Sequence, residues 1–128
     1  MVSAAAKSII EQMRANMGAP LMTLEEERTG WAEFASKEKI LEGTLVSGVS
    51  LNEVACEWVE REDSDPQVLL LIHGGGFNSG SPRIHRRFAS MMAKASGHRV
   101  LVPDYRLSPE NPFPAGIDDI VAVYAALV

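Results

Sequence analysis

The stretch LLLIHGGGFNSGSP, residues 69–82, leads from a run of apolar residues into a loop rich in glycine. The full apolar run, QVLLLIH (67–73), is continuous, which is typical of a strand buried on both faces of a parallel sheet. The consecutive glycines then predict either a flexible loop or a loop whose backbone N–H groups approach a negative charge, since glycine carries no Cβ. The elements on either side favour the second interpretation.

The residues that follow complete a strand–loop–helix–strand unit over residues 67–103. Ser81 and Pro82 are typical of a helix start, and Gly97 is typical of a helix end. The apolar face of this helix is predicted from residues at helical spacing: Ile84, Phe88, Met91, Met92 and Ala95. HRVLVPDY (98–105) predicts the next buried strand, which the crossover sets parallel to the first. Open α/β sheets bind ligands beyond the carboxyl ends of such strands, so we expect the glycine loop in a ligand-binding site.

The remaining elements predict an α/β fold with a separate N-terminal helical layer. Residues 4–17 show helical apolar spacing, and Thr23 with Glu26 forms the capping-box pattern of a second helix. EGTLVSGVSL (42–51) and VACEWVE (54–60) predict the strands of a hairpin or meander. A final helix over residues 114–128 is predicted from Ile117, Ile120, Val121 and Tyr124.

The chain of 128 residues has the composition of an ordinary globular domain, with 46% hydrophobic and 23% charged residues. Its formal net charge of −5 gives no electrostatic basis for binding nucleic acid or an anionic membrane. Cys56 is the only cysteine and no Cys/His cluster predicts a metal site, so we expect no cofactor. No apolar run approaches a membrane span in length, and residues 1–18 lack a signal-peptide pattern, which predicts a cytoplasmic protein.

A glycine-rich loop after a buried strand is suited to two chemistries. The lysine of the phosphate-binding GxxxxGKS/T motif is missing. A dinucleotide fingerprint fits in part, because Gly74 and Gly76 are correctly spaced and Asp104 ends the next strand, but Ser79 stands at the third glycine position. The other chemistry is an oxyanion hole, in which N–H donors stabilise the negative oxygen of an attacked ester carbonyl by about 3 kcal/mol each.

A second segment makes the pattern more specific. HGGGF (73–77) followed by DYRLSPENPFPAGIDD (104–119) resembles the hormone-sensitive-lipase family of α/β-hydrolase esterases, whose usual pattern is HGGGF, DYRLAPE and then HPFPA. This chain has Ser108 in place of the alanine and Asn111 in place of the histidine. The resemblance implies the N-terminal portion of an α/β-hydrolase fold, with cap helices in residues 1–40 and part of the core in residues 41–128.

The resemblance also implies roles for individual residues. Gly75 and Gly76 are expected to supply oxyanion N–H groups, Gly74 to shape the turn, and His73 to orient the loop from below. A hydrogen-bonded scaffold that holds the loop against the strand ends is expected from Asp104, Tyr105, Arg106 and Glu110. A structural role is also the simpler interpretation of these four residues.

Apolar side chains of the N-terminal helices are candidates for substrate contacts. We expect Phe77, Met17 and Phe34 to line an acyl or alcohol pocket, together with Met13, Met22 and Trp31. The alternative is that these side chains only pack the cap helices onto the core, as apolar helical stripes usually do.

The residues of a hydrolase triad are not found in the sequence. Such an esterase needs a GxSxG serine, an acid and a histidine in that order, and Gly76–Gly80 has one residue too many before its serine. His85 is expected on a solvated helix face and His98 in a turn. In the family, the serine elbow lies beyond the helix that ends this chain.

We therefore expect the N-terminal segment of a carboxylic-ester hydrolase acting on a small-molecule ester, with this chain inactive by itself. Its expected partner is the remaining part of the hydrolase chain or a second copy, since strand 67–73 would otherwise be an open apolar edge. The alternatives are a non-catalytic small-molecule-binding member of the same fold and a dinucleotide-binding domain.

Overall fold

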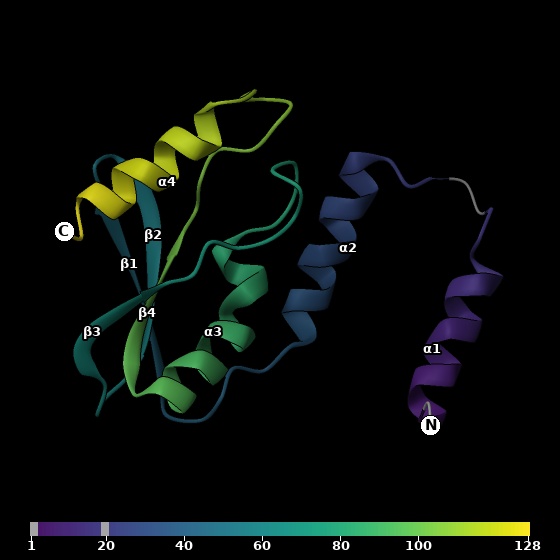
Figure 1. Cartoon of the computed structure of the whole chain (residues 1–128), viewed down its shortest axis with the longest axis horizontal. Coiled ribbons are helices and arrows are strands. Elements are labelled where there is room, and N and C mark those ends of the chain that lie inside the picture. Colours follow the sequence, from purple (N-terminus) through teal and green to yellow (C-terminus); the bar gives the residue numbers. More distant parts are fainter. Residues whose placement is uncertain (1–2, 19–20) are drawn as a thin grey trace.

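A computed structural model describes residues 3–18 and 21–128 of the chain, which form an α/β fold with one mixed sheet (Figure 1). The elements are, in order, α1 (Ala4–Ala15), α2 (Leu24–Lys37), β1 (Thr44–Leu51), β2 (Val54–Arg61), β3 (Asp65–Leu70), α3 (Pro82–Ser96), β4 (His98–Pro103) and α4 (Ala115–Ala125). The strand order in the sheet is β1-β2-β4-β3. The predicted fold class is confirmed.

The sheet combines an antiparallel hairpin with a parallel crossover. β1 and β2 pair antiparallel through a tight turn at Asn52 and Glu53, whose φ angles of 46° and 69° are those of a hairpin turn that matches the twist of the strands. β4 pairs antiparallel with β2 and parallel with β3. The predicted strand–loop–helix–strand unit is therefore confirmed as β3, α3 and β4, with the glycine loop at the carboxyl end of β3.

Two hydrophobic clusters, one on each face of the sheet, use alternate residues of β4. Val100 and Val102 pack with Ala89 and Ala93 of α3. Leu101, between them in the sequence, packs on the opposite face with Val123 of α4. β4 is thus buried, as the sequence predicts, and the structure places it inside the sheet between β2 and β3, with α3 and α4 on opposite faces.

The prediction that residues 67–73 form a strand buried on both faces is wrong for this chain. β3 lies at the edge of the sheet, and Val68 and Ile72 keep 37% and 48% of their surface exposed. The reason is that β3 has β4 on one side and no strand on the other among the residues described. The continuous apolar run therefore forms an open apolar edge, as expected for this strand without a further neighbour.

The predicted apolar faces of α3 and α4 also need correction. Phe88 and Met91 of α3 remain 52% and 49% exposed, while small residues of the adjacent sector, such as Ala89 and Ala93, contact the sheet. In α4, Val121 and Tyr124 are similarly exposed. Small side chains let a helix backbone approach the sheet closely, so the larger residues turn to the side.

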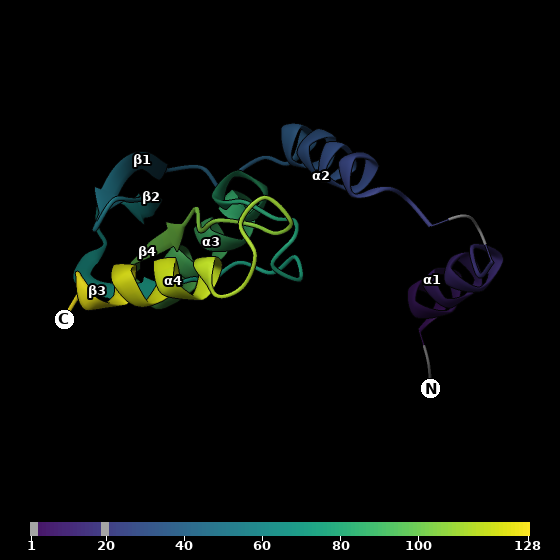
Figure 2. The same ribbon diagram turned by 90° about the horizontal axis from the view of Figure 1, so that it is seen from above.

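The N-terminal helices lie outside this two-sided core. Figures 1 and 2 show α1 apart from the sheet and α2 beside α3. Neither helix has a buried residue in the part of the chain that the structure describes. The capping box of α2 is confirmed, since Thr23 and Glu26 exchange hydrogen bonds. No helix within residues 3–18 and 21–128 is long and apolar enough to cross a membrane. The location in the cell stays a prediction.

Candidate active site

The glycine loop, residues 73–81, has a backbone that only glycine accommodates at two positions. Gly75 has a φ of +130° and Gly80 a φ of +97°. A Cβ at Gly75 would overlap the carbonyl oxygen of Ser79, and a Cβ at Gly80 would overlap the carbonyl oxygen of Gly74. These glycines allow the loop to fold back closely on itself, which excludes the interpretation of a merely flexible linker.

Three successive carbonyl groups at the start of this loop are bound, and the three N–H groups that follow them have no acceptor among the residues described. The His73 carbonyl accepts a hydrogen bond from the Tyr105 hydroxyl at 2.7 Å, and the Gly74 carbonyl accepts one from Nδ1 of His73 at 3.0 Å. The Gly75 carbonyl accepts bonds from the N–H groups of Asn78 and Ser79 at 3.1 and 2.9 Å. Among the residues described, the N–H groups of Gly74, Gly75 and Gly76 donate to no protein acceptor.

Planar peptide geometry links these two observations. In a trans peptide the carbonyl of one residue and the N–H of the next are coplanar and point in opposite directions. A bound carbonyl therefore fixes the direction of the N–H in the same peptide group. The bound carbonyls of His73, Gly74 and Gly75 fix in this way the N–H groups of Gly74, Gly75 and Gly76, respectively. The loop presents a set of oriented donors that can bind an anion or a developing oxyanion.

His73 is buried to 97% and stacks against two other rings. Its ring stacks on Tyr105 with centroids 4.2 Å apart and on His85 at 5.4 Å. Because a carbonyl can only accept, the contact with Gly74 places the ring proton on Nδ1. Burial lowers the pKa of His73 below its usual value of 6.5, which keeps this ring neutral at neutral pH.

Arg106 joins the segment after β4 to the start of α4. Its guanidinium forms an ion pair with Asp119 at 2.7 Å, and its backbone N–H donates to the same carboxylate at 2.9 Å. These bonds hold the pKa of the nearly buried Asp119 below its usual range. Gly116 allows the close approach, because a Cβ there would lie 2.8 Å from the Arg106 carbonyl oxygen. The sequence predicted Arg106 as scaffold and missed Asp119 as its partner.

Asp104 departs from the expected scaffold. Its backbone N–H donates to the Ala55 carbonyl at 2.8 Å, but its carboxylate makes no hydrogen bond within the described ranges 3–18 and 21–128. Partial burial raises the pKa of Asp104, while the neighbouring His73 lowers it. The backbone, and not the carboxylate, ties this residue to the sheet.

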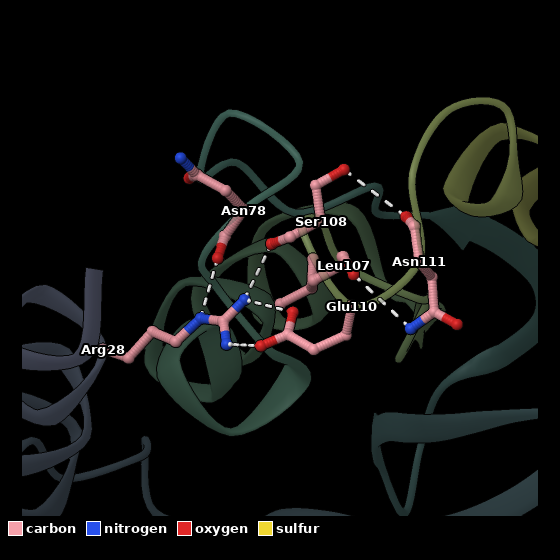
Figure 3. Close-up of polar contacts among 6 residues, drawn as sticks. All are labelled: Arg28, Asn78, Leu107, Ser108, Glu110 and Asn111. Atoms are coloured by element: carbon pink, nitrogen blue, oxygen red, sulfur yellow. Dashed lines mark hydrogen bonds and ion pairs between the residues drawn. The ribbon is translucent and has the colours of Figure 1, made fainter.

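Arg28 of α2 was not singled out from the sequence, although it binds the glycine loop directly (Figure 3). Its Nε donates to the Asn78 carbonyl at 2.8 Å, and its Nη2 donates to the Ser108 carbonyl at 2.8 Å. Its two Nη atoms also pair with the Glu110 carboxylate at 2.7 and 3.0 Å. Glu110 is thus bound by α2. The position of Arg28, three residues before Trp31 on the same helical face, is the signal that could have found it.

A cavity of about 280 Å³ lies where α2, α3 and the glycine loop meet. It is lined by Glu27, Trp31, Gly74, Gly75, Ser79, Gly80, Ile84 and His85. The Ser79 hydroxyl donates to the Glu27 carboxylate at 3.0 Å, which links the loop to α2 beside the cavity. Two of the three glycines whose N–H groups are free, Gly74 and Gly75, therefore line this cavity.

The predicted substrate contacts are distributed unevenly around this site. Phe77 lines a second cavity of about 190 Å³, and the centroid of its ring lies 5.5 Å from that of Tyr105. Phe34 reaches the first cavity only through Trp31, which it meets edge-on at 6.1 Å. Met17, in the turn after α1, is 80% exposed and lines neither cavity.

Two histidine predictions are wrong. His85 does not lie on a solvated helix face; it is half-buried, lines the larger cavity and stacks on His73. The flanking Arg86 and Arg87 suggested solvent, but α3 turns His85 toward the loop. His98 is the first residue of β4, where its Nδ1 contacts the Asp65 carboxylate at 2.9 Å, and so it does not lie in the turn that the sequence suggested.

Known proteins resemble the chain in sequence and in fold. A family model of the α/β hydrolase fold matches residues 69–128. An acetyl-hydrolase from Streptomyces hygroscopicus is 41% identical over 80 residues, which are 62% of this chain and 27% of that protein. The crystal structure of a hormone-sensitive lipase from a metagenome library superposes with a TM-score of 0.85 at 32% identity, over 94% of this chain and 41% of that one. The chain belongs to the hormone-sensitive-lipase family of α/β-hydrolases.

Further members and relatives show the same partial coverage. An esterase from the bacterial hormone-sensitive lipase family has a TM-score of 0.84 at 34% identity, over 99% of this chain and 43% of that one. Tuliposide A-converting enzyme b1 from Tulipa gesneriana is 37% identical over 93 residues, 70% of this chain and 24% of that enzyme. The chain thus spans about a quarter of these curated relatives and about two fifths of these solved structures.

Ser108 and Asn111, the two departures from the family's usual pattern, both form hydrogen bonds through their backbone groups. Ser108 donates its backbone N–H to the Phe77 carbonyl at 2.8 Å and offers its carbonyl to Arg28. Asn111 donates its backbone N–H to the Leu107 carbonyl at 2.9 Å. Because these bonds use backbone groups, other side chains at these positions can form them as well.

Proposed function

We propose that the natural polypeptide containing this chain is a carboxylic-ester hydrolase, and that the glycine loop supplies its oxyanion hole. The observation that carries the proposal is the set of free, oriented N–H groups of Gly74, Gly75 and Gly76. The relatives that share the fold include an acetyl-hydrolase, a lipase and esterases, which supports an ester as the substrate class.

The geometry suggests how the loop would act. When a nucleophile attacks an ester carbonyl, its oxygen becomes negative, and the N–H groups of Gly75 and Gly76 would donate to that oxygen. Their directions are already fixed, so the donors need not reorganise during the reaction, and each contributes about 3 kcal/mol to lowering the barrier. His73 stays neutral and would hold the Gly74 carbonyl away from the oxyanion.

The proposal assigns the rest of the active site to polypeptide beyond residue 128. Residues 1–128 contain no GxSxG motif, so the serine, the acid and the histidine would come from there. In the same proposal residues 1–40, which contain α1 and α2, form the cap, and residues 41–128 form part of the hydrolase core. Phe77, Phe34 and Met17 stay proposed substrate contacts, with Phe77 the best placed of the three.

The dinucleotide alternative has less support. Ser79, at the position of the third fingerprint glycine, is buried, and its single hydroxyl proton has two acceptors within reach, the Glu27 carboxylate at 3.0 Å and the Gly75 carbonyl at 3.1 Å. A side chain held in this way fills the space that the fingerprint leaves for close packing of backbone. The other alternative is a small-molecule-binding protein of the same fold without a catalytic triad. It would show neither the ester turnover nor the serine labelling expected of the hydrolase.

The test uses the natural polypeptide that contains residues 1–128. We expect it to hydrolyse short p-nitrophenyl esters with repeated turnover and to be labelled covalently at one serine by a fluorophosphonate. The absence of both turnover and labelling would contradict the proposed function. Heat release on titration with NAD, without ester turnover, would favour the dinucleotide alternative.

A further inference from the structure

Arg28 is connected to the proposed oxyanion donors through two successive peptide groups. Its Nε donates to the carbonyl of Asn78, and the N–H of the same peptide, carried by Ser79, donates to the Gly75 carbonyl at 2.9 Å. The Gly75 carbonyl in turn shares its peptide plane with the N–H of Gly76. Neither peptide is cis. A rotation of the Asn78–Ser79 peptide would therefore change the direction of the Gly76 N–H.

The second branch of the guanidinium fixes the same loop from its other side. Nη2 of Arg28 donates to the Ser108 carbonyl at 2.8 Å, and the Ser108 N–H donates to the Phe77 carbonyl at 2.8 Å. Phe77 has a φ of +59°, which is unfavourable for a residue with a Cβ. The carbonyls on both sides of the Asn78 N–H, those of Phe77 and Asn78, are thus held through Arg28.

We propose that Arg28 is a positioning residue: through the Asn78–Ser79 peptide, this cap-helix arginine sets the orientation of the Gly76 N–H. The catalytic consequence rests on the proposed function, whereas the structural consequence does not. Hydrogen bonds in series polarise one another, so a guanidinium at the Asn78 carbonyl also strengthens the Ser79 bond to Gly75. Glu110 acts as a counter-charge that keeps the planar fork of Arg28 in this geometry.

Another arginine offers a matched control. Arg87 of α3 also binds the end of the α2 segment through a glutamate and a carbonyl, with Glu38 at 2.9 Å and the Lys39 carbonyl at 2.8 Å. Within the described part of the chain, Arg87 forms no hydrogen bond or ion pair with the glycine loop. Arg87→Ala therefore weakens the attachment of α2 in a similar way and leaves the Asn78 carbonyl bound.

The experiment compares amide hydrogen exchange in the natural polypeptide and its variants. The Ser79 amide reports on the loop, and the Val100 amide, in the buried centre of β4, reports on global opening. In Arg28→Ala we expect Ser79 to exchange on the order of tenfold faster relative to Val100, because a charge-assisted hydrogen bond is lost. In Arg87→Ala we expect this ratio to change less than about twofold. Ethylguanidinium added to Arg28→Ala should restore the ratio, and ethylammonium should not.

If Arg28→Ala does not fold, Arg28→Lys provides the same comparison, since an ammonium group cannot reach three acceptors with fork geometry. A Ser79-to-Val100 exchange ratio that is equal in the Arg28 and Arg87 variants would overturn the proposal. With ester turnover present, we expect the Arg28 variants to lower kcat with little change in KM, and a change in KM alone would overturn the positioning role. Absence of turnover in the natural protein contradicts the proposed function, while the exchange ratio still decides whether Arg28 positions the loop.

Discussion

At the scale of single residues, the loop depends on backbone groups that no side-chain motif describes. The free N–H groups of the glycines have fixed directions because the preceding carbonyls are bound by Tyr105, by His73 and by the loop itself. Gly75 combines a φ of +130° with a contact that leaves no space for a Cβ, so the loop needs glycine here for steric reasons, apart from the donor role proposed for its N–H. Gly48 of β1 has neither constraint, and nothing lies within 4 Å of a Cβ built there.

The first prediction concerns Gly75→Ala in the natural polypeptide. We expect the free energy of unfolding to fall by about 2 kcal/mol or more, because alanine is strained at this φ and its Cβ overlaps the Ser79 carbonyl. We expect kcat for ester hydrolysis to fall on the order of 100-fold, since the donors move. Chemical denaturation and steady-state kinetics provide the two measurements. Gly48→Ala is the control, and a Gly75→Ala protein as stable and active as that control would show that the loop tolerates a side chain.

At the scale of elements, α2 is attached to the core mainly by polar contacts. It has no buried residue among those described, and its bonds to the loop come from Glu27 and Arg28. Such an attachment depends on charge, unlike the apolar contacts that hold α3 and α4 on the sheet. The Arg28 guanidinium lowers the pKa of Glu110 to about 2, through the hydrogen bonds between them.

The second prediction is a pH window for this attachment. The pKa of Glu110 in the folded protein, about 2, lies below the value of 4.5 for an unperturbed glutamate, so its ionised form is favoured by folding. Its stabilising contribution is complete above pH 4.5 and is lost as the pH falls toward 2. The Tm difference between the unaltered protein and Glu110→Gln should therefore be constant above pH 4.5 and shrink below it. Glu62→Gln, in an exposed turn, is the control, and a Tm difference independent of pH would contradict the prediction.

At the scale of the whole molecule, the sheet has an open apolar edge at β3. β3 is an edge strand with an exposed Val68, Ile72 just after it is also exposed, and α4 presents Val121 and Tyr124 to solvent. An exposed apolar edge carries unpaired backbone groups and promotes association with other strands. The chain spans about two fifths of the solved family structures it matches. The apolar run of β3 has the composition of a central strand, although it lies at an edge here.

The third prediction is that isolated residues 1–128 do not form a stable monomer. We expect concentration-dependent association in sedimentation experiments and no reversible cooperative melt, because the β3 edge pairs between copies. Val68→Lys should reduce this association, since a charged edge strand resists pairing. Gln12→Lys, on the exposed α1, adds the same charge elsewhere and should not. A reversible, cooperative melt of a monomer would refute the prediction.

The sequence by itself determined the fold class, the family, the hairpin, the crossover and the location of the glycine loop. These follow from local periodicity, capping residues and the spacing of HGGGF and DYR, which lie within short stretches of chain. The tertiary structure alone decided which helix sector faces the sheet, where His85 lies, and that Arg28 binds the loop. Arg28 and Asn78 are separated by 50 positions in the chain. No local pattern encodes such a contact, because it depends on how α2 and the loop come together when the chain folds.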